Sequence, residues 1–244
     1  MKPIRLLYLG LCFFYVPLKA QNSYQYGLFP TIDHTGTISK RFDYSLYYFG
    51  GFNLINRDEN RVKQPANLFV CYAEQALTYK ASSKLSFSGS YVFERQFPSK
   101  INYRNENRFY LQSTYLQQLN KETIKHRLRF DGRFIQNRST GKSPFTSRIR
   151  YLIGINSPIS KSNDKLYFSA YNEFFFNTYK DAATIYGENW AYAGIGYKSK
   201  HAGNFEVGPL YIFWVKNSRF DLDNFLYLQL TWATQLNWMK KQSN

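Results

Sequence analysis

The amino-acid sequence predicts an all-β protein: a closed antiparallel transmembrane β-barrel of about ten strands, following a cleaved signal peptide. Three observations predict this class. The chain begins with an export signal, its later segments alternate apolar and polar residues over long stretches, and 22 Tyr and 22 Phe occur among its 244 residues. This length fits one sizeable domain.

The first 20 residues have the order of a secretory signal peptide. Lys2 and Arg5 precede an apolar run, Leu6–Leu18, and Ala20 is the small residue at the predicted cleavage position. A helix that spans a bilayer needs about 20 apolar residues, so this run is too short to serve as an anchor. Cys12 lies within the run, and cleavage there as in a lipoprotein would cut the apolar segment in half. We therefore expect export and cleavage after Ala20.

Composition excludes several classes of protein. Cys71 is the only cysteine after the signal segment, so no internal disulfide is available to staple a small secreted domain. The formal net charge is +16, which would ordinarily suggest nucleic acid as a partner. For an exported barrel we instead expect contact with outer-membrane lipid and lipopolysaccharide phosphates, or with small anionic solutes, and no nucleic acid.

Alternation with a period of two is the dominant pattern in the chain. The segment 122–137 places Arg127, Arg129 and Asp131 on one face and Leu128 and Phe130 on the other. Such segments run well beyond the roughly 5–6 residues usual in soluble sandwiches, and they suit membrane strands of ~9–11 residues with extensions. Aromatic residues near the segment ends suggest interfacial girdles. These residues are Tyr103, Phe109, Tyr167, Phe176, Trp190, Trp214 and Trp238.

Gap lengths predict the topology. Short gaps alternate with longer polar ones, and bacterial barrels have short periplasmic turns and longer outer loops. The predicted strands are 39–53, 66–80, 84–96, 103–118, 122–137, 146–158, 164–177, 188–198, 204–216 and 223–238. This gives a signal peptide at 1–20, an N-terminal segment of uncertain placement at 21–38 and a barrel domain at 39–244, with both barrel ends at the periplasmic side. Residues 22–34 could join the wall, occupy the lumen or stay periplasmic; twelve strands is the alternative count.

The inward-facing positions hold a cluster of charged residues. On the assigned parity its members are Glu94, Glu106, Arg108, Arg127, Arg129, Asp131, Arg133, Arg148, Arg150 and Glu173. Arginine–carboxylate pairs could brace a narrow lumen, or surplus arginines could form an anion-attracting constriction. Because side chains fill much of the interior of a small barrel, the bracing interpretation is favoured.

Catalytic and metal-binding patterns are sparse. Of the three histidines, His126 is expected on the lipid-facing side, with Leu128 rather than a serine at the next position on the same face, and His201 is expected in a solvated turn. No cluster has metal-ligand spacing, and no glycine-rich phosphate loop opens a helix. We therefore expect no catalytic site, no cofactor-binding site and no metal site, and we expect that the protein is not an enzyme. A lipid-modifying outer-membrane hydrolase is the least favoured alternative.

Several segments resemble a family of bacterial outer-membrane barrels, common in Bacteroidota-type genomes, that is known as a domain of unknown function. The resemblance is carried by NENRFYLQ, HRLRFDGRF, SRIRYLIGIN, YNEFFFN and FEVGPLYIFW and covers most of the mature chain. The matching positions are Glu106 and Arg108; Arg127, Arg129, Asp131 and Arg133; Arg148, Arg150 and Tyr151; and Asn172, Glu173 and Phe174. Trp190 stands where an arginine is expected. The resemblance implies a fold and a location, and no activity.

Two functions are compatible with these features. The first is a small porin-like channel or passive transport protein with a basic lumen, in the outer membrane of a Gram-negative bacterium. The alternative is a non-conducting structural or surface-interaction barrel that binds through loops such as 54–65 and 178–187. The sequence leaves open the solute, the oligomeric state and the loop partners.

Overall fold

The computed structural model describes residues 22–57, 62–99, 102–160 and 165–237, and most of them lie in β-strands. The strands are β1 (Ser23–Thr37), β2 (Phe42–Arg57), β3 (Lys63–Gln64), β4 (Asn67–Lys80), β5 (Leu85–Ser99), β6 (Asn102–Leu119), β7 (Glu122–Ile135), β8 (Phe145–Pro158), β9 (Leu166–Asn177), β10 (Tyr186–Ser199), β11 (Gly203–Val215) and β12 (Leu222–Asn237). In this part of the chain, no helix has the length and apolar character needed to cross a membrane. The predicted signal peptide lies outside the described residues.

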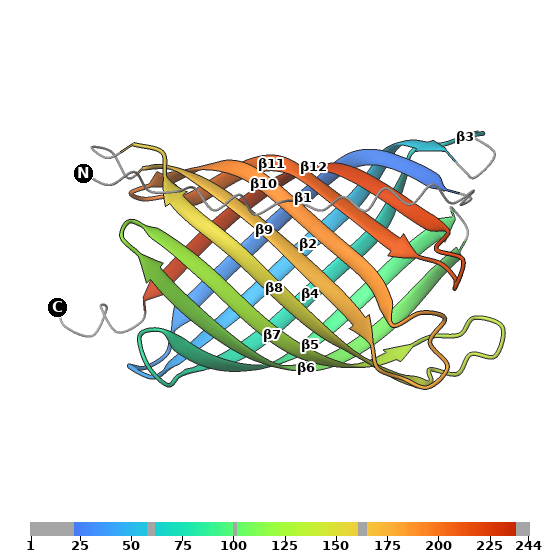
Figure 1. The fold of residues 1–244 in the computed structure, drawn as a ribbon, viewed down its shortest axis with the longest axis horizontal. Helices are drawn as coiled ribbons and strands as arrows, with labels where there is room; N and C mark the ends of the chain where they lie inside the picture. Colours follow the sequence, from blue (N-terminus) through green and yellow to red (C-terminus); the bar gives the residue numbers. More distant parts are fainter. Residues whose placement is uncertain (1–21, 58–61, 100–101, 161–164, 238–244) are drawn as a thin grey trace, which may run out of the picture.

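The strands form one sheet that closes on itself (Figure 1). Each strand from β4 to β12 pairs antiparallel with the next, and β2 pairs with both β1 and β4. The barrel closes where β1 pairs with β12, over the register Ser23↔Asp223 to Thr37↔Asn237. The wall therefore has eleven strands, and the two-residue β3 is an addition at the end of β2. The predicted all-β closed barrel is confirmed.

The closing seam corrects three details of the predicted topology. The ten predicted strands correspond to β2 and β4–β12, but β1 also belongs to the wall, so the wall begins at Ser23 rather than near residue 39. With eleven strands in a simple meander, the first and last run in the same direction, and the closing pair is parallel rather than antiparallel. The physical reason is that β12 would otherwise leave a long row of unpaired backbone groups, which β1 satisfies. The wall thus begins and ends at opposite ends of the barrel.

The two ends of the barrel differ in their connections. At one end, here called the short-turn end, lie the turns 38–41, 81–84, 120–121 and 200–202, the connection 159–165, and the last residue of β12. The opposite end, called the long-loop end, has the connections 58–66, 100–101, 136–144, 178–185 and 216–221, together with the first residue of β1. Only β5 and β6 are joined there by a short connection.

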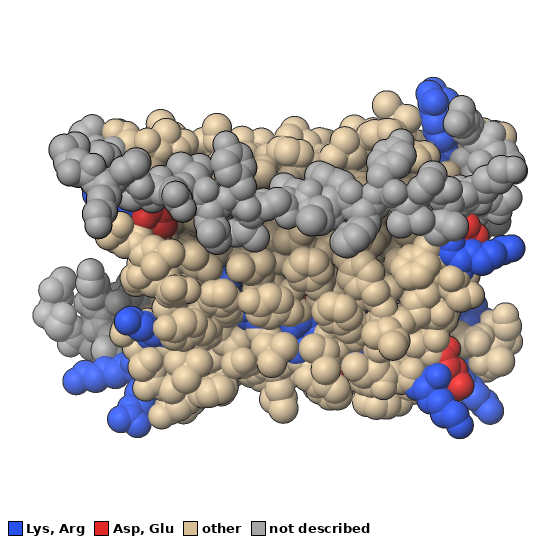
Figure 2. Space-filling view, viewed as in Figure 1, with Lys and Arg blue, Asp and Glu red and all other residues tan. Residues whose placement is uncertain are grey.

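The outward face of the wall is apolar around its middle. Alternate residues such as Phe109, Leu111 and Leu128 are more than half exposed on this face, as the alternation predicts. Figure 2 shows that the visible face between the ends is almost free of charge, whereas Lys and Arg side chains gather at both ends. Cys71 is also exposed, as a free thiol.

The predicted aromatic girdle is only partly outward. Tyr103 and Phe109 are exposed, but Trp190 and Trp214 line the lumen and Tyr167 is buried against Glu206, so these three are wrong as girdle residues. All three sit on the inward parity of their strands, where they contact other lumen residues. Trp238 lies outside the described residues.

Candidate functional site in the barrel lumen

The ten charged residues predicted to face the lumen do come together there. They lie on five consecutive strands, β5 to β9, and most are almost completely buried; Asp131 has no exposed surface. Strict alternation on adjoining strands places these side chains on the same inner wall, because every second residue of a strand points inward. The structure thus brings the ten side chains together on one inner wall.

Ion pairs join neighbouring strands on the side nearest β5 and β6. The Arg108 guanidinium lies 2.6 Å from the Glu106 carboxylate and 3.0 Å from that of Glu94. Arg133, on β7, donates two hydrogen bonds to the two carboxylate oxygens of Glu106, at 2.7 and 2.8 Å. Such two-point pairing fixes the relative orientation of both side chains.

A second group of ion pairs spans β7, β8 and β9. Arg148 donates to Asp131 at 2.6 Å, and Arg150 lies 3.6 Å from the same carboxylate. Arg150 and Arg127 both contact Glu173, at 2.8 and 2.7 Å. Every carboxylate in this group thus has two arginine neighbours, and the pairs continue without interruption from one strand to the next.

Two carboxylates that complete the network were not predicted. Glu74 on β4 lies 3.4 Å from Arg129 and accepts hydrogen bonds from the hydroxyls of Tyr72 and Tyr110. Glu188 on β10 lies 3.2 Å from Arg148. Glu74 lies at an inward-facing position of its predicted strand, and this alternation was the sequence pattern that could have identified it as a lumen residue. Its partner Arg129 lies 55 residues away, so the local pattern could not reveal the pair.

The completed network is balanced in charge, which corrects the expected surplus of arginine in this cluster. Its six arginines are 108, 127, 129, 133, 148 and 150, and its six carboxylates are Glu74, Glu94, Glu106, Asp131, Glu173 and Glu188. Each arginine has at least one carboxylate within 4.0 Å. A buried charge is costly without such a partner, so balance is expected where the cluster excludes water.

An aromatic layer continues this network across the lumen. Phe49 on β2 stacks on Tyr72 with ring centres 4.4 Å apart, and its ring centre lies 6.0 Å from that of Trp190 on β10. Trp190 in turn contacts Phe175, and the Arg150 guanidinium lies 4.4 Å above the Phe175 ring. Because β2 and β10 are separated by β1, β12 and β11 in the wall, these contacts bridge the interior.

Contacts nearer the long-loop end repeat this bridging. Phe69 on β4 lies 5.3 Å from Trp214 on β11, measured between ring centres. The indole N–H groups of Trp190 and Trp214 both donate to Glu188, at 2.5 and 2.6 Å, which joins the aromatic layer to the ion pairs. Together, aromatic and charged side chains form a barrier across the lumen, called here the lumen barrier. Its central residues, including Phe29, Glu106 and Asp131, are at most 2% exposed.

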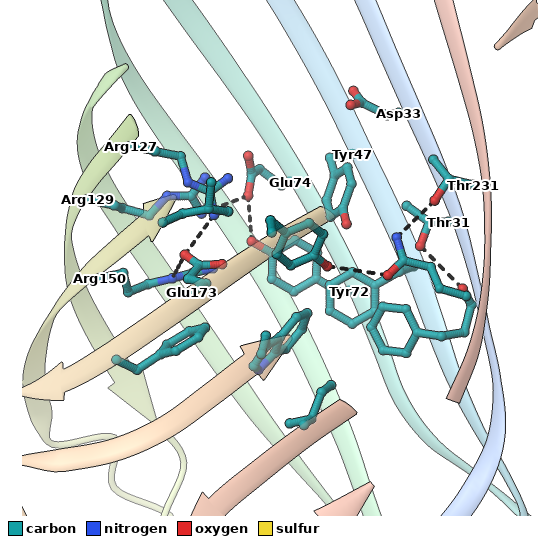
Figure 3. A pocket seen from close by; sticks show the side chains of 18 of the residues that line it. Thr31, Asp33, Tyr47, Tyr72, Glu74, Arg127, Arg129, Arg150, Glu173 and Thr231 are labelled. Carbon is teal, nitrogen blue, oxygen red and sulfur yellow. Dashed lines mark hydrogen bonds and ion pairs between the residues drawn. The ribbon is translucent and has the colours of Figure 1, made fainter. Parts of the chain in front are cut away.

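The short-turn half of the lumen is lined mainly by smaller side chains. A cavity of about 570 Å³ lies within the barrel, and towards the short-turn end small polar residues line it. These include Thr31, Thr35, Ser45, Thr78, Ser88, Asn156, Ser169 and Thr231. Figure 3 shows Asp33 and Tyr47 projecting into this region, beside Glu74 and Arg127 of the lumen barrier. This region is called here the short-turn pocket.

All three histidines lie outside the lumen. The His126 Nδ1 atom is hydrogen-bonded to the Tyr151 hydroxyl oxygen at 2.9 Å. This contact lies on the outward face near the short-turn end, where His126 was expected. His34 lies on the outward side of β1, 2.7 Å from the Thr234 hydroxyl and 3.0 Å from that of Tyr44. His201 is exposed in the turn between β10 and β11. Among the described residues, no group of three or more His, Cys, Asp or Glu side chains is placed to hold a metal ion.

These features define the class of protein as a closed β-barrel with a balanced ion-pair network buried in its lumen. The chain belongs to the family described as "Protein of unknown function (DUF2490)", whose profile matches residues 25–224. No curated protein and no solved structure matches the chain. The resemblance to an uncharacterised family is therefore confirmed, and the match includes most of β1, the strand whose place the sequence left open.

Proposed function

We propose that this protein is an outer-membrane β-barrel of a Gram-negative bacterium whose lumen does not conduct ions freely. Its placement in a membrane is supported by the apolar outward band between two charged ends, which has the character of a lipid-facing surface. The export signal expected at residues 1–20 supports passage through the inner membrane. On this proposal the short-turn end faces the periplasm and the long-loop end faces outward.

The observation that carries the non-conducting function is the lumen barrier. Each of its six arginines is paired, so none is available as a free anion site. The aromatic contacts between Phe49 and Trp190 occupy the region between opposite walls. An ion that crosses this layer would have to separate buried charge pairs, which is costly in a medium of low dielectric constant.

The test is single-channel recording in a planar bilayer with the folded barrel, checked first by a heat-dependent shift of its electrophoretic band. We expect wild-type protein to give no discrete conductance steps at neutral pH. Arg129→Ala combined with Glu74→Ala, which removes a pair of side chains that reaches across β5 and β6, should produce measurable conductance if that variant still folds. Lys84→Ala, in a turn outside the lumen, is the matched control and should remain silent.

Conductance by the wild-type barrel would favour the alternative function, a small channel or passive transport protein. The observation in favour of that alternative is the internal cavity of about 570 Å³, which extends along much of the lumen. Anion selectivity that is lost in Arg148→Ala would identify the arginines as its filter. The absence of steps from a verified, folded barrel would contradict the channel.

We propose outer-leaflet lipopolysaccharide as the surrounding lipid partner. The Arg95 guanidinium lies 4.4 Å from the ring centre of Tyr103, and that of Arg138 lies 5.9 Å from the same ring, at the rim of the long-loop end. Two guanidinium groups on one aromatic side chain suit the phosphates of this lipid. Lipopolysaccharide should stabilise the wild-type barrel against heat more than it stabilises Arg95→Ala/Arg138→Ala, whereas Lys84→Ala at the opposite end should behave as wild type.

A further inference from the structure

The short-turn pocket contains two opposite charges that have no partner. Neither the Asp33 carboxylate on β1 nor the Lys125 ammonium on β7 forms a hydrogen bond or an ion pair within 4.0 Å with any described residue. Figure 3 shows Asp33 standing apart from the bonded residues around it. Lys125 is exposed although its side chain lines the lumen, so water reaches it there. This contrasts with the lumen barrier, where every arginine is paired.

The two charges lie on opposite walls. In the ring of eleven strands, β1 and β7 are separated by β2, β4, β5 and β6 along one arc and by β8 to β12 along the other. They are close enough to interact electrostatically without being in contact. The space between them is part of the cavity. A ligand placed there would meet an anion on one side and a cation on the other.

The wall between these charges supplies further polar groups. Arg127 is paired with Glu173 through one terminal nitrogen, while its Nε is buried and has no hydrogen-bond partner among the described residues. The Tyr47 side chain projects into the same space, and the Thr31 and Thr231 side chains line the cavity. A few polar groups that converge on a concave space are typical of sites for small molecules. The whole lumen cavity, of which the short-turn pocket is one part, lies within the usual volume of such sites, about 300–1,000 Å³.

We propose that the short-turn pocket binds a small zwitterion, with its ammonium group at Asp33 and its anionic group at Lys125. The shared chemistry is one primary ammonium and one carboxylate or phosphate, as in a short peptide or a phosphoethanolamine group. The ligand enters from the short-turn end, because the paired charges and aromatic rings of the lumen barrier narrow the lumen on the other side. This inference rests on the proposed non-conducting barrel and adds a ligand to it.

The experiment is calorimetric titration of the full folded barrel in detergent with defined probes. Glycylglycine and O-phosphoethanolamine carry both charges, and the stronger binder of the two distinguishes carboxylate from phosphate. Acetate and ethanolamine each carry one charge and serve as matched controls. We expect at least one zwitterion to bind at least tenfold more tightly than either control, because charged contacts act at both of its ends.

Substitutions of Asp33 and Lys125 test whether each side chain contacts one end of the zwitterion. Asp33→Asn and Lys125→Gln should each weaken binding of the preferred zwitterion by about tenfold or more, since each removes one charge-assisted contact. The exchanged pair Asp33→Lys/Lys125→Asp keeps both charges and should bind more tightly than either single variant. Lys84→Gln and Asp181→Asn change exposed charges outside the lumen and should leave the affinity unchanged.

Equal affinities for zwitterions and single-charge controls, or zwitterion binding that is unchanged in Asp33→Asn and Lys125→Gln, would overturn the inference. Absence of binding to any probe by a barrel that folds and does not conduct would also overturn it, while leaving the proposed function intact. Conductance by the wild-type barrel would instead contradict the proposed function. The two proposals can therefore fail separately.

Discussion

At the scale of single residues, the lumen barrier depends on buried carboxylates, three of which (Glu106, Asp131 and Glu173) are each held by two arginines. Asp131 has no exposed surface, and its closest partner is the Arg148 Nε at 2.6 Å. Its other oxygen, Oδ1, has no hydrogen-bond partner among the described residues. A carboxylate in this environment depends on its arginine neighbours, because few other groups replace the hydration that it loses.

Removing Arg148 should therefore destabilise the barrel. In Arg148→Ala, Asp131 and Glu188 both lose a partner, and breaking a buried pair on one side costs about 3–5 kcal/mol. The measurement is unfolding by denaturant in lipid, followed by the loss of tryptophan fluorescence. Arg219→Ala is the control, because this side chain is 81% exposed and lies 3.8 Å from Asp221; a change of about 0–1 kcal/mol is expected for such a surface pair. Equal effects of the two substitutions would contradict a bracing role.

At the scale of elements, the parallel seam between β1 and β12 decides how the barrel closes. Its register places Ile32 opposite Trp232 and Leu28 opposite Leu228. In a parallel pair the residue numbers of the two strands rise in the same direction along the barrel, whereas in an antiparallel pair they rise in opposite directions. The parallel seam can therefore be tested by finding out which residues of β1 and β12 face each other.

Disulfide cross-linking should report this register. With Cys71 replaced by serine, the pair Ile32→Cys/Trp232→Cys should form a disulfide under mild oxidation and alter electrophoretic mobility. Tyr26→Cys/Leu236→Cys is the control pair; its members are placed ten residues apart in register and should not cross-link. A cross-link in the control pair alone would indicate another way of closing the wall.

Gly27 gives a second test of the same seam, from the side of β2. A register shift lies between Tyr26 and Gly27, and a Cβ at Gly27 would lie 1.7 Å from the backbone oxygen of Phe52. Gly27→Ala should therefore cost at least the roughly 1–3 kcal/mol typical of overpacking, because backbone must move. In Gly89→Ala the nearest atom would be a Leu111 side-chain carbon at 3.9 Å, so the free energy of unfolding should change little. Similar unfolding curves for the two variants would argue against the close approach of β1 and β2.

At the scale of the whole molecule, we propose that the protein is not an enzyme. The arrangement that most resembles a catalytic pair is His34 beside the Thr234 hydroxyl on the outward face. Its other ring nitrogen meets the Tyr44 hydroxyl, where a hydrolase would more usually place a carboxylate or amide to orient the imidazole. This contact is better suited to anchoring the end of the seam.

The corresponding prediction concerns phospholipid hydrolysis. Purified barrel in mixed phospholipid micelles should release no fatty acid above the level of a detergent blank. His34→Ala and His126→Ala should not change that rate, and His201→Ala serves as a control in an exposed turn. Hydrolysis by wild type that is abolished in one of the first two variants, with folding intact, would establish an enzyme and identify its histidine.

Much of this architecture follows from the sequence by itself. Strict alternation in segments such as 122–137 fixes which residues face inward, because a strand has a period of two whatever its neighbours are. For that reason the local pattern predicts that Arg129, Asp131 and Arg148 share the inner face, where the structure places them. The apolar outward residues follow from the same rule.

Only the tertiary structure decided the closure of the wall, the balance of the lumen charges and the separation of the barrier from the pocket. The place of β1 depends on an unpaired edge 200 residues away, and Glu74 gains its role from Arg129 across two intervening strands. Trp190 and Trp214 face inward although aromatic residues near strand ends suggested a girdle, because inward parity and the Glu188 carboxylate outweigh that tendency. Alternation determines the face of each residue, but contacts across a closed lumen depend on register and curvature, which no local segment contains.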